Sequence, residues 1–204
     1  MPKVKICGIT QPEQAREISL AGVDYIGVIL YPKSPRFVDL EKVKEIKKRL
    51  SDKTKLVAVV VNPDIDMGKN LLEIVDIIQF HGDEDIEFIK QFPKDKVIKA
   101  FRLKDEKDIE KIKPFLEEGF TVLVDGYREG EYGGTGTQID LKLLKKVCSI
   151  SDKVIIAGGL SDENIDSVLK EVKPFGVDAS SKLETAPGIK DIEKVKRFIK
   201  LVKR

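Results

Sequence analysis

The sequence predicts an α/β protein, a single (β/α)8 TIM barrel that spans residues 1–204. Short apolar runs typical of strands alternate with amphipathic helical segments from one end of the chain to the other. Such alternation, without a block of helices or a meander of strands, implies parallel strands joined by right-handed crossovers. Eight strand–helix units, spaced by about 20 to 30 residues, favour closure into a barrel. A doubly wound open sheet is the alternative, but it would normally contain fewer strands for this length.

The expected strands share an enrichment in Val, Ile and Leu. The run at 55–61 is nearly continuous in Val, Ala and Leu, as in a parallel strand that is buried on both faces. Strands are expected at residues 4–7, 24–30, 55–61, 76–81, 96–101, 120–125, 153–157 and 175–179.

The expected helices follow each strand in turn. In the first of them Thr10 suits the N-cap, Pro12 suits the first turn and Glu13 completes a capping box with Thr10. Gly22 ends that helix. Helices are expected at residues 11–21, 39–50, 65–75, 83–91, 106–117, 141–148, 162–171 and 191–202.

Composition excludes several classes of protein. Two cysteines make no disulfide framework, and with one histidine they cannot fill a structural zinc site. The net charge of +2, with 35% of residues charged, argues against a nucleic-acid partner. No apolar run is long enough to span a bilayer, and the N-terminus lacks the apolar core of a signal peptide, so a cytoplasmic protein without a membrane partner is expected. The oligomeric state, a homodimer included, stays open.

The first strand has two unlike sides. Period-two alternation puts Lys5 and Cys7 on one side and Val4 and Ile6 on the other. Lys5 is therefore expected to point into the barrel, where a charge needs a partner. Because the eighth strand adjoins the first in a closed barrel, Asp178 is the expected partner. We also expect the positive charge of Lys5 to lower the pKa of Cys7 below that of a free thiol.

Polar residues collect where strands end, which is where barrels of this kind have their active sites. Cys7 ends the first strand, His81 the fourth and Asp125 the sixth. Asp125 ends an otherwise apolar strand, so its carboxylate needs a partner or a task. Arg36 lies in the loop at 31–37, which prolines stiffen. The plainer alternatives are a small buried hydrophobe for Cys7 and a strand-end hydrogen bond for His81.

The loops after the last two strands suggest a phosphate site. Gly158 and Gly159 offer backbone N–H groups ahead of a helix, although such a pair also occurs in tight turns. Asp178 ends the eighth strand, and Ser180 and Ser181 could begin a short extra helix that faces an anion. No glycine-rich nucleotide motif is found where nucleotide binding would need one.

The segment at 126–137 is rich in glycine and includes Gly134. It suits a lid that closes over a substrate. The alternative is a connector without a function.

Six motifs together carry a resemblance to a known family. In chain order they are KICGI at 5–9, YPKSPR at 31–36, QFHG at 79–82, YGGTG at 132–136, GGL at 158–160 and DASS at 178–181. Over essentially its whole length the chain resembles the phosphoribosylanthranilate isomerase family of tryptophan biosynthesis. The KICG start combined with the arginine of the second loop is specific to that family among phosphate-binding barrels.

The resemblance implies an Amadori rearrangement of N-(5-phosphoribosyl)anthranilate, a small phosphosugar, with no cofactor and no metal. It implies that Asp125 is the general acid, that Cys7 is the general base and that Arg36 binds the anthranilate carboxylate. The other substrate-binding residues that we predict are His81, Gly134, Gly158, Gly159, Asp178, Ser180 and Ser181. One departure is Lys182, where the family usually has glycine.

Two other function classes remain as alternatives. A histidine-pathway isomerase would be expected to use an aspartate rather than Cys7 as its base and to contain half-barrel repeats, and we find no convincing repeat. A non-catalytic phosphosugar-binding barrel would need neither Cys7 nor Asp125.

Overall fold

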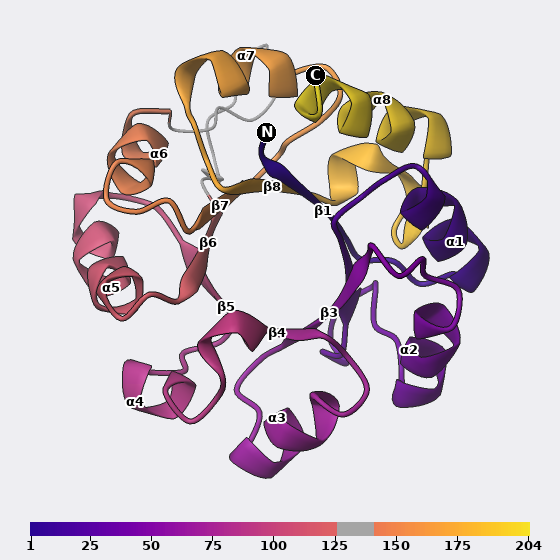
Figure 1. The fold of residues 1–204 in the computed structure, drawn as a ribbon, viewed down its shortest axis with the longest axis horizontal. Coiled ribbons are helices and arrows are strands. Elements are labelled where there is room, and N and C mark those ends of the chain that lie inside the picture. Colours follow the sequence, from indigo (N-terminus) through magenta and orange to yellow (C-terminus); the bar gives the residue numbers. More distant parts are fainter. Residues whose placement is uncertain (126–140) are drawn as a thin grey trace.

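The computed structural model describes residues 1–125 and 141–204. Its strands β1 to β8 form a closed parallel barrel in chain order, and helices surround the barrel on the outside (Figure 1). The predicted TIM barrel is therefore confirmed. The strands are β1 (Lys3–Cys7), β2 (Tyr25–Ile29), β3 (Lys55–Val60), β4 (Ile77–Phe80), β5 (Val97–Arg102), β6 (Thr121–Asp125), β7 (Val154–Ala157) and β8 (Gly176–Ala179).

The helices agree with the predicted positions, and two of them, α5 and α6, have the predicted bounds. The largest difference is α4, which is less than half as long as predicted because the residues before it form a loop, in which the Gly82 N–H donates to Glu84 Oε2 at 3.0 Å, and Asp85 caps the helix. The helices are α1 (Pro12–Leu20), α2 (Leu40–Lys47), α3 (Ile65–Leu71), α4 (Ile86–Ile89), α5 (Glu106–Glu117), α6 (Leu141–Cys148), α7 (Ile165–Glu171) and α8 (Ile192–Val202).

Aspartates begin most of these helices. The side chain of each accepts a hydrogen bond from an N–H group of the first turn, which satisfies a donor that the helix itself leaves free. These N-caps are Asp39, Asp64, Asp85, Asp105 and Asp191. Helix α1 differs, and the predicted Thr10 cap is wrong. Gln11 occupies the N-cap without a side-chain bond, because the Thr10 hydroxyl donates instead to the carbonyl of Gly188 at 2.7 Å.

Gly188 belongs to a small antiparallel hairpin that we did not predict. Its strands are β9 (Glu184–Ala186) and β10 (Ile189–Lys190), which follow one 3-10 turn, η2 (Ser181–Leu183). That turn is the short extra helix expected after Ser180. A second 3-10 turn, η1 (Lys94–Lys96), precedes β5. The hairpin lies against α1, where the side chain of Gln14 bonds both the carbonyl and the N–H of Lys190, at 2.8 and 2.9 Å.

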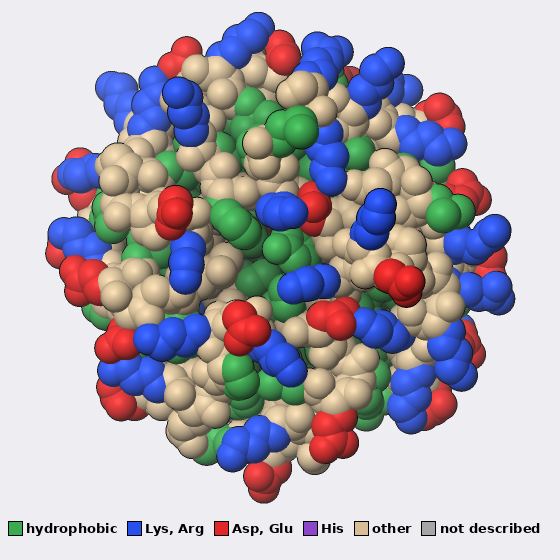
Figure 2. All heavy atoms as spheres, in the orientation of Figure 1, with side chains coloured by type: hydrophobic (Ala, Val, Ile, Leu, Met, Phe, Trp, Pro, Cys, Tyr) green, Lys and Arg blue, Asp and Glu red, His purple; other side chains and the backbone are tan. Residues whose placement is uncertain are grey.

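Two apolar layers hold the barrel. One lies between the strands and the helices, and the other fills the barrel itself. The inner layer consists of Val57, Ile77, Ile98, Ala100, Leu123, Ile155 and Ala157. Lys and Arg side chains are interspersed with Asp and Glu side chains over the face drawn in Figure 2, as the nearly balanced charge requires. None of the helices within residues 1–125 and 141–204 has the length and the apolar character needed to cross a bilayer.

Candidate active site

A buried ion pair lies inside the barrel just below the carboxyl ends of its strands. Lys5 on β1 is paired in register with Asp178 on β8, and its Nζ lies 2.9 Å from Oδ2 of that carboxylate. Both side chains are buried. The pairing predicted from strand alternation is therefore confirmed.

The surroundings of this pair shift the pKa values of both groups. Burial alone would lower the pKa of Lys5, but Asp178 and Cys7 raise it above the ordinary value. Lys5 therefore keeps its charge. Burial raises the pKa of Asp178 and outweighs the opposing effect of Lys5. The second oxygen of Asp178, Oδ1, is buried without a hydrogen-bond partner among the described residues.

Cys7 lies at the end of β1, directly above this pair and opposite Gly27 of β2. A Cβ at Gly27 would lie 2.8 Å from the Cys7 sulfur and 3.2 Å from the Lys5 Nζ, so only glycine leaves room for both side chains. Cys7 is 7% exposed. Burial raises the pKa of its thiol, and Lys5 offsets only part of that rise. The predicted lowering of the Cys7 pKa is therefore wrong, because burial destabilises the thiolate by more than the charge of Lys5 stabilises it.

Gly8, the next residue, explains how Arg36 reaches the same site. Its φ of +79° favours glycine, and a Cβ there would lie 2.5 Å from the Arg36 Cδ. The stem of Arg36 therefore crosses directly over the chain beside Cys7. Its guanidinium is bound by Glu184, with Nε 2.8 Å from Oε1 and Nη2 2.6 Å from Oε2.

Lys190 joins this group from the hairpin. Its side chain is fully buried, and its Nζ lies 2.6 Å from Glu184 Oε1 and 3.3 Å from the Ser180 carbonyl. Ser180 in turn donates through Oγ to the Cys7 carbonyl at 3.0 Å. Sequence reasoning missed Glu184 and Lys190 because it left residues 183–190 as an unexamined connection. The sequence Pro187-Gly188 is typical of a turn, and the opposite charges of Glu184 and Lys190 lie on either side of it. Together they could have predicted a hairpin with an ion pair.

His81 follows β4 on the other side of the mouth. Its Nδ1 lies 3.2 Å from Nε2 of Gln79. Burial lowers the pKa of His81 and the charge of Lys5 lowers it further, which favours the neutral ring at pH 7. A buried ion pair that we did not predict, Lys99 with Glu84 at 3.1 Å, lies under this loop, and Lys99 also donates to the Gly82 carbonyl at 2.7 Å.

Asp125 ends β6 as predicted, half-buried and in register with Ala157 of β7. Its negative charge opposes the lowering of the His81 pKa and adds slightly to the raising of the Asp178 pKa. The predicted lid at 126–137, with Gly134, lies outside the described residues.

The predicted phosphate-binding residues lie in neighbouring loops. Gly158 and Gly159 follow β7 with φ angles of +101° and +68°, and both are partly exposed. Among the described residues, no protein acceptor receives the N–H of Gly159 or of Ser181. Lys182 is exposed. The two loops therefore offer free backbone donors beside Ser180, as an anion site requires.

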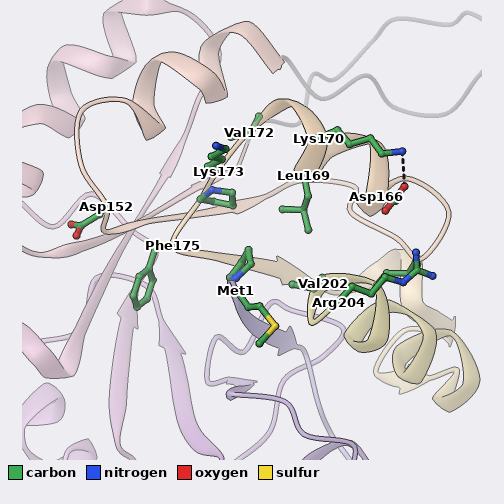
Figure 3. Close-up of a pocket in the computed structure, with 13 residues that line it drawn as sticks. Met1, Asp152, Asp166, Leu169, Lys170, Val172, Lys173, Phe175, Val202 and Arg204 are labelled. Carbon is green, nitrogen blue, oxygen red and sulfur yellow. Dashed lines mark ion pairs between the residues drawn. The ribbon is translucent and has the colours of Figure 1, made fainter.

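A separate cavity of about 650 Å³ lies at the opposite end of the barrel (Figure 3). Met1, which precedes β1, and Phe175, which precedes β8, line it together with Leu169 of α7 and Val202 of α8. It contains none of the predicted site residues, so it is not the candidate site. Within the described part of the chain, no group of three or more His, Cys, Asp or Glu side chains could hold a metal ion.

Comparisons with known proteins find relatives that match almost the whole chain. The model of the family described as N-(5'phosphoribosyl)anthranilate (PRA) isomerase matches residues 4–201. An N-(5'-phosphoribosyl)anthranilate isomerase from Sulfurihydrogenibium is 64% identical over 200 residues, which cover 98% of each chain. Among solved structures, a phosphoribosylanthranilate isomerase of Thermotoga maritima, described as dimeric and solved as monomers, has a TM-score of 0.87 and 32% identity. Another isomerase, in complex with reduced 1-(o-carboxyphenylamino)-1-deoxyribulose 5-phosphate, has a TM-score of 0.88 and 32% identity; both matches cover 100% of this chain and 99% of the other.

Proposed function

The chain belongs to the N-(5'-phosphoribosyl)anthranilate isomerase family, and from that premise we propose how its own residues carry out the isomerisation. The protein is an isomerase of tryptophan biosynthesis. The reaction that we propose is the Amadori rearrangement of N-(5-phosphoribosyl)anthranilate to 1-(2-carboxyphenylamino)-1-deoxyribulose 5-phosphate. The observation that carries the proposal is the match across residues 4–201, which contain Cys7 and Asp125 at the ends of β1 and β6.

In the first step, Asp125 acts as the general acid. It gives a proton to the oxygen of the furanose ring, the bond from C1 to that oxygen breaks, and the nitrogen lone pair forms a Schiff base. What supports this role is the position of Asp125 at the mouth, where its charge acts on His81 and Asp178. A positioned acid typically accelerates such a step by about 10² to 10⁴.

In the second step, Cys7 acts as the general base. Its thiolate takes the proton from C2, the electron pair forms a C1–C2 double bond, and the iminium electrons return to nitrogen. The enolamine then tautomerises to the ketone. The proximity of Lys5, which stays protonated, supports this role because a cation stabilises the thiolate that must form.

Substrate binding is assigned to the remaining residues of the mouth. We propose that Arg36 binds the anthranilate carboxylate, because a guanidinium offers a planar fork that matches it. The backbone N–H groups of Gly158 and Gly159, with Ser180 and Ser181, are proposed to hold the phosphate. His81, Asp178 and Gly134 complete the proposed substrate contacts. Pairing with a second copy of the chain, as in the dimeric relative, is a separate proposal that analytical ultracentrifugation tests.

The direct test is turnover. Phosphoribosylanthranilate, generated immediately before use, should lose its fluorescence when the protein is added, and mass spectrometry should find a product of unchanged mass. Asp125→Asn should lower kcat by about 10²-fold or more, since positioned proton transfer is typically worth 10² to 10⁴. Full activity in Asp125→Asn would remove that residue from the mechanism, and no turnover by the unchanged protein would refute the function.

A further inference from the structure

The side chain of Arg36 is held along one edge only. A guanidinium can bind a carboxylate side-on through Nε and Nη2 or end-on through Nη1 and Nη2. Glu184 occupies the side-on edge, with Oε1 2.8 Å from Nε and Oε2 at 3.1 Å from Nε and 2.6 Å from Nη2. Among the described residues, no acceptor receives Nη1. The end-on edge is therefore available to a ligand.

Glu184 is itself held by further contacts. Its side chain is 4% exposed, and its Oε1 accepts from the buried Lys190 at 2.6 Å and from the Gly188 N–H at 3.3 Å. The hairpin that carries these residues is bound to the β1–α1 segment through Thr10 and Gln14. The carboxylate that orients Arg36 thus rests on a braced element, and its orientation does not depend on a ligand.

We propose that Glu184 and Lys190 are positioning residues, which fix Arg36 so that it receives the substrate carboxylate end-on through Nη1 and Nη2. This inference rests on the proposed function, in which Arg36 binds that carboxylate. It adds two residues that contact Arg36 or each other rather than the substrate.

Charge and connectivity both favour this arrangement. Arg36, Glu184 and Lys190 together carry one net positive charge, so the group still attracts an anion after Glu184 is paired. Lys190 also contacts Ser180, whose hydroxyl bonds the Cys7 carbonyl. The carboxylate site, the phosphate loop and the base are therefore linked through successive contacts. Orienting the arginine in advance removes part of the entropic cost of ordering it when substrate binds.

The inference is tested by calorimetric binding of two ligands to the full chain. One is the reduced carboxyphenylamino-deoxyribulose phosphate, and the other is the same compound without its ring carboxylate. Glu184→Gln should weaken binding of the first by roughly 10- to 100-fold, as for a lost hydrogen bond to a charged group. It should leave binding of the second unchanged. In Arg36→Met, adding Glu184→Gln should cause no further loss.

Two further variants separate positioning from folding. Glu184→Gln leaves the Lys190 cation buried beside a neutral amide, which could destabilise the fold. The double variant Glu184→Gln with Lys190→Met removes that cation. It should show the same loss of affinity for the carboxylated ligand alone, so the test holds even if the single variant folds poorly. Asp24→Asn is the matched control, because Asp24 also bridges two lysines, Lys3 and Lys203, but does so at the amino end of the barrel. It should change neither affinity.

Four results would overturn the inference. Unchanged binding of the carboxylated ligand means that Glu184 does not orient Arg36, and tighter binding means that it competes with the ligand. An equal loss for both ligands means that it only supports the fold. If the unchanged protein neither converts phosphoribosylanthranilate nor binds either ligand, the proposed function fails, and this inference fails with it.

Discussion

Gly27→Ala is the substitution whose effect follows most directly from the site geometry. The added Cβ would lie 2.8 Å from the Cys7 sulfur and 3.1 Å from the Cys7 Cα. Because non-bonded carbon atoms prefer separations of about 3.5 to 4.0 Å, the sulfur must retreat by roughly 1 Å. A misplacement of that size can cost about 10²-fold in rate. We therefore expect kcat to fall by about 10²-fold, with a stability loss of about 1 to 3 kcal/mol for the added methyl group.

The assay compares kcat, from the loss of substrate fluorescence, with the rate at which iodoacetamide alkylates Cys7. Cys148 is the second free thiol of the chain, so the assay is run in a Cys148→Ala background, in which alkylation reports Cys7 alone. Gly176→Ala is the matched control, since its Cβ would lie 3.0 Å from the Lys3 carbonyl at the other end of the barrel. It should lower stability and leave kcat unchanged. Wild-type values of both kcat and alkylation rate in Gly27→Ala would refute the reasoning.

Three further predictions concern charge. Burial raises the pKa of Cys7, and the proposed base is its thiolate. We therefore expect kcat/KM to keep rising as the pH passes the ordinary thiol pKa of about 8.5. A plateau of kcat/KM at neutral pH would contradict this. Lys5→Met should slow Cys7 alkylation at fixed pH, and breaking the buried pair should cost about 3 to 5 kcal/mol in urea unfolding; an unchanged alkylation rate would show that Lys5 is structural only. Burial alone would raise the pKa of Asp24, but hydrogen bonds from the Val4 N–H, Lys203 and Lys3 lower it below its value in the unfolded chain. The ionised carboxylate therefore stabilises the fold at pH values above the unfolded-state pKa. This stabilisation is lost as the pH falls through the folded-state pKa. Asp24→Asn should therefore cost about 1.5 to 3 kcal/mol at pH 7 and much less near pH 2; an equal cost at both pH values would contradict the linkage.

Residues with a fixed geometric relation were predictable from the sequence. The alternation of strands and helices implied the barrel, and strand parity with closure then implied that Lys5 meets Asp178, which the structure confirms at 2.9 Å. The position of Cys7 at the mouth follows from the same two facts. Both depend only on the period of a strand and on the order of strands in the barrel.

Features that depend on long-range competition were not predictable. The capping box at Thr10 was locally consistent, but the carbonyl of Gly188, distant in sequence, accepts the hydroxyl instead. The direction of the Cys7 pKa shift depends on the balance between burial and the charge of Lys5, and a sequence does not give burial. Glu184 reaches Arg36 only because an unpredicted hairpin folds back against α1.

The single-turnover rate of Cys7→Ala tests the central claim most directly. With enzyme in excess over freshly generated phosphoribosylanthranilate, the rate reports chemistry without product release. If Cys7 takes the C2 proton, this rate should fall by about 10² to 10⁴-fold relative to the unchanged protein. The melting temperature should change little, since Cys7 lies at the mouth and alanine leaves only a small gap. A rate equal to that of the unchanged protein would mean that Cys7 is a packing residue and that another group removes the proton.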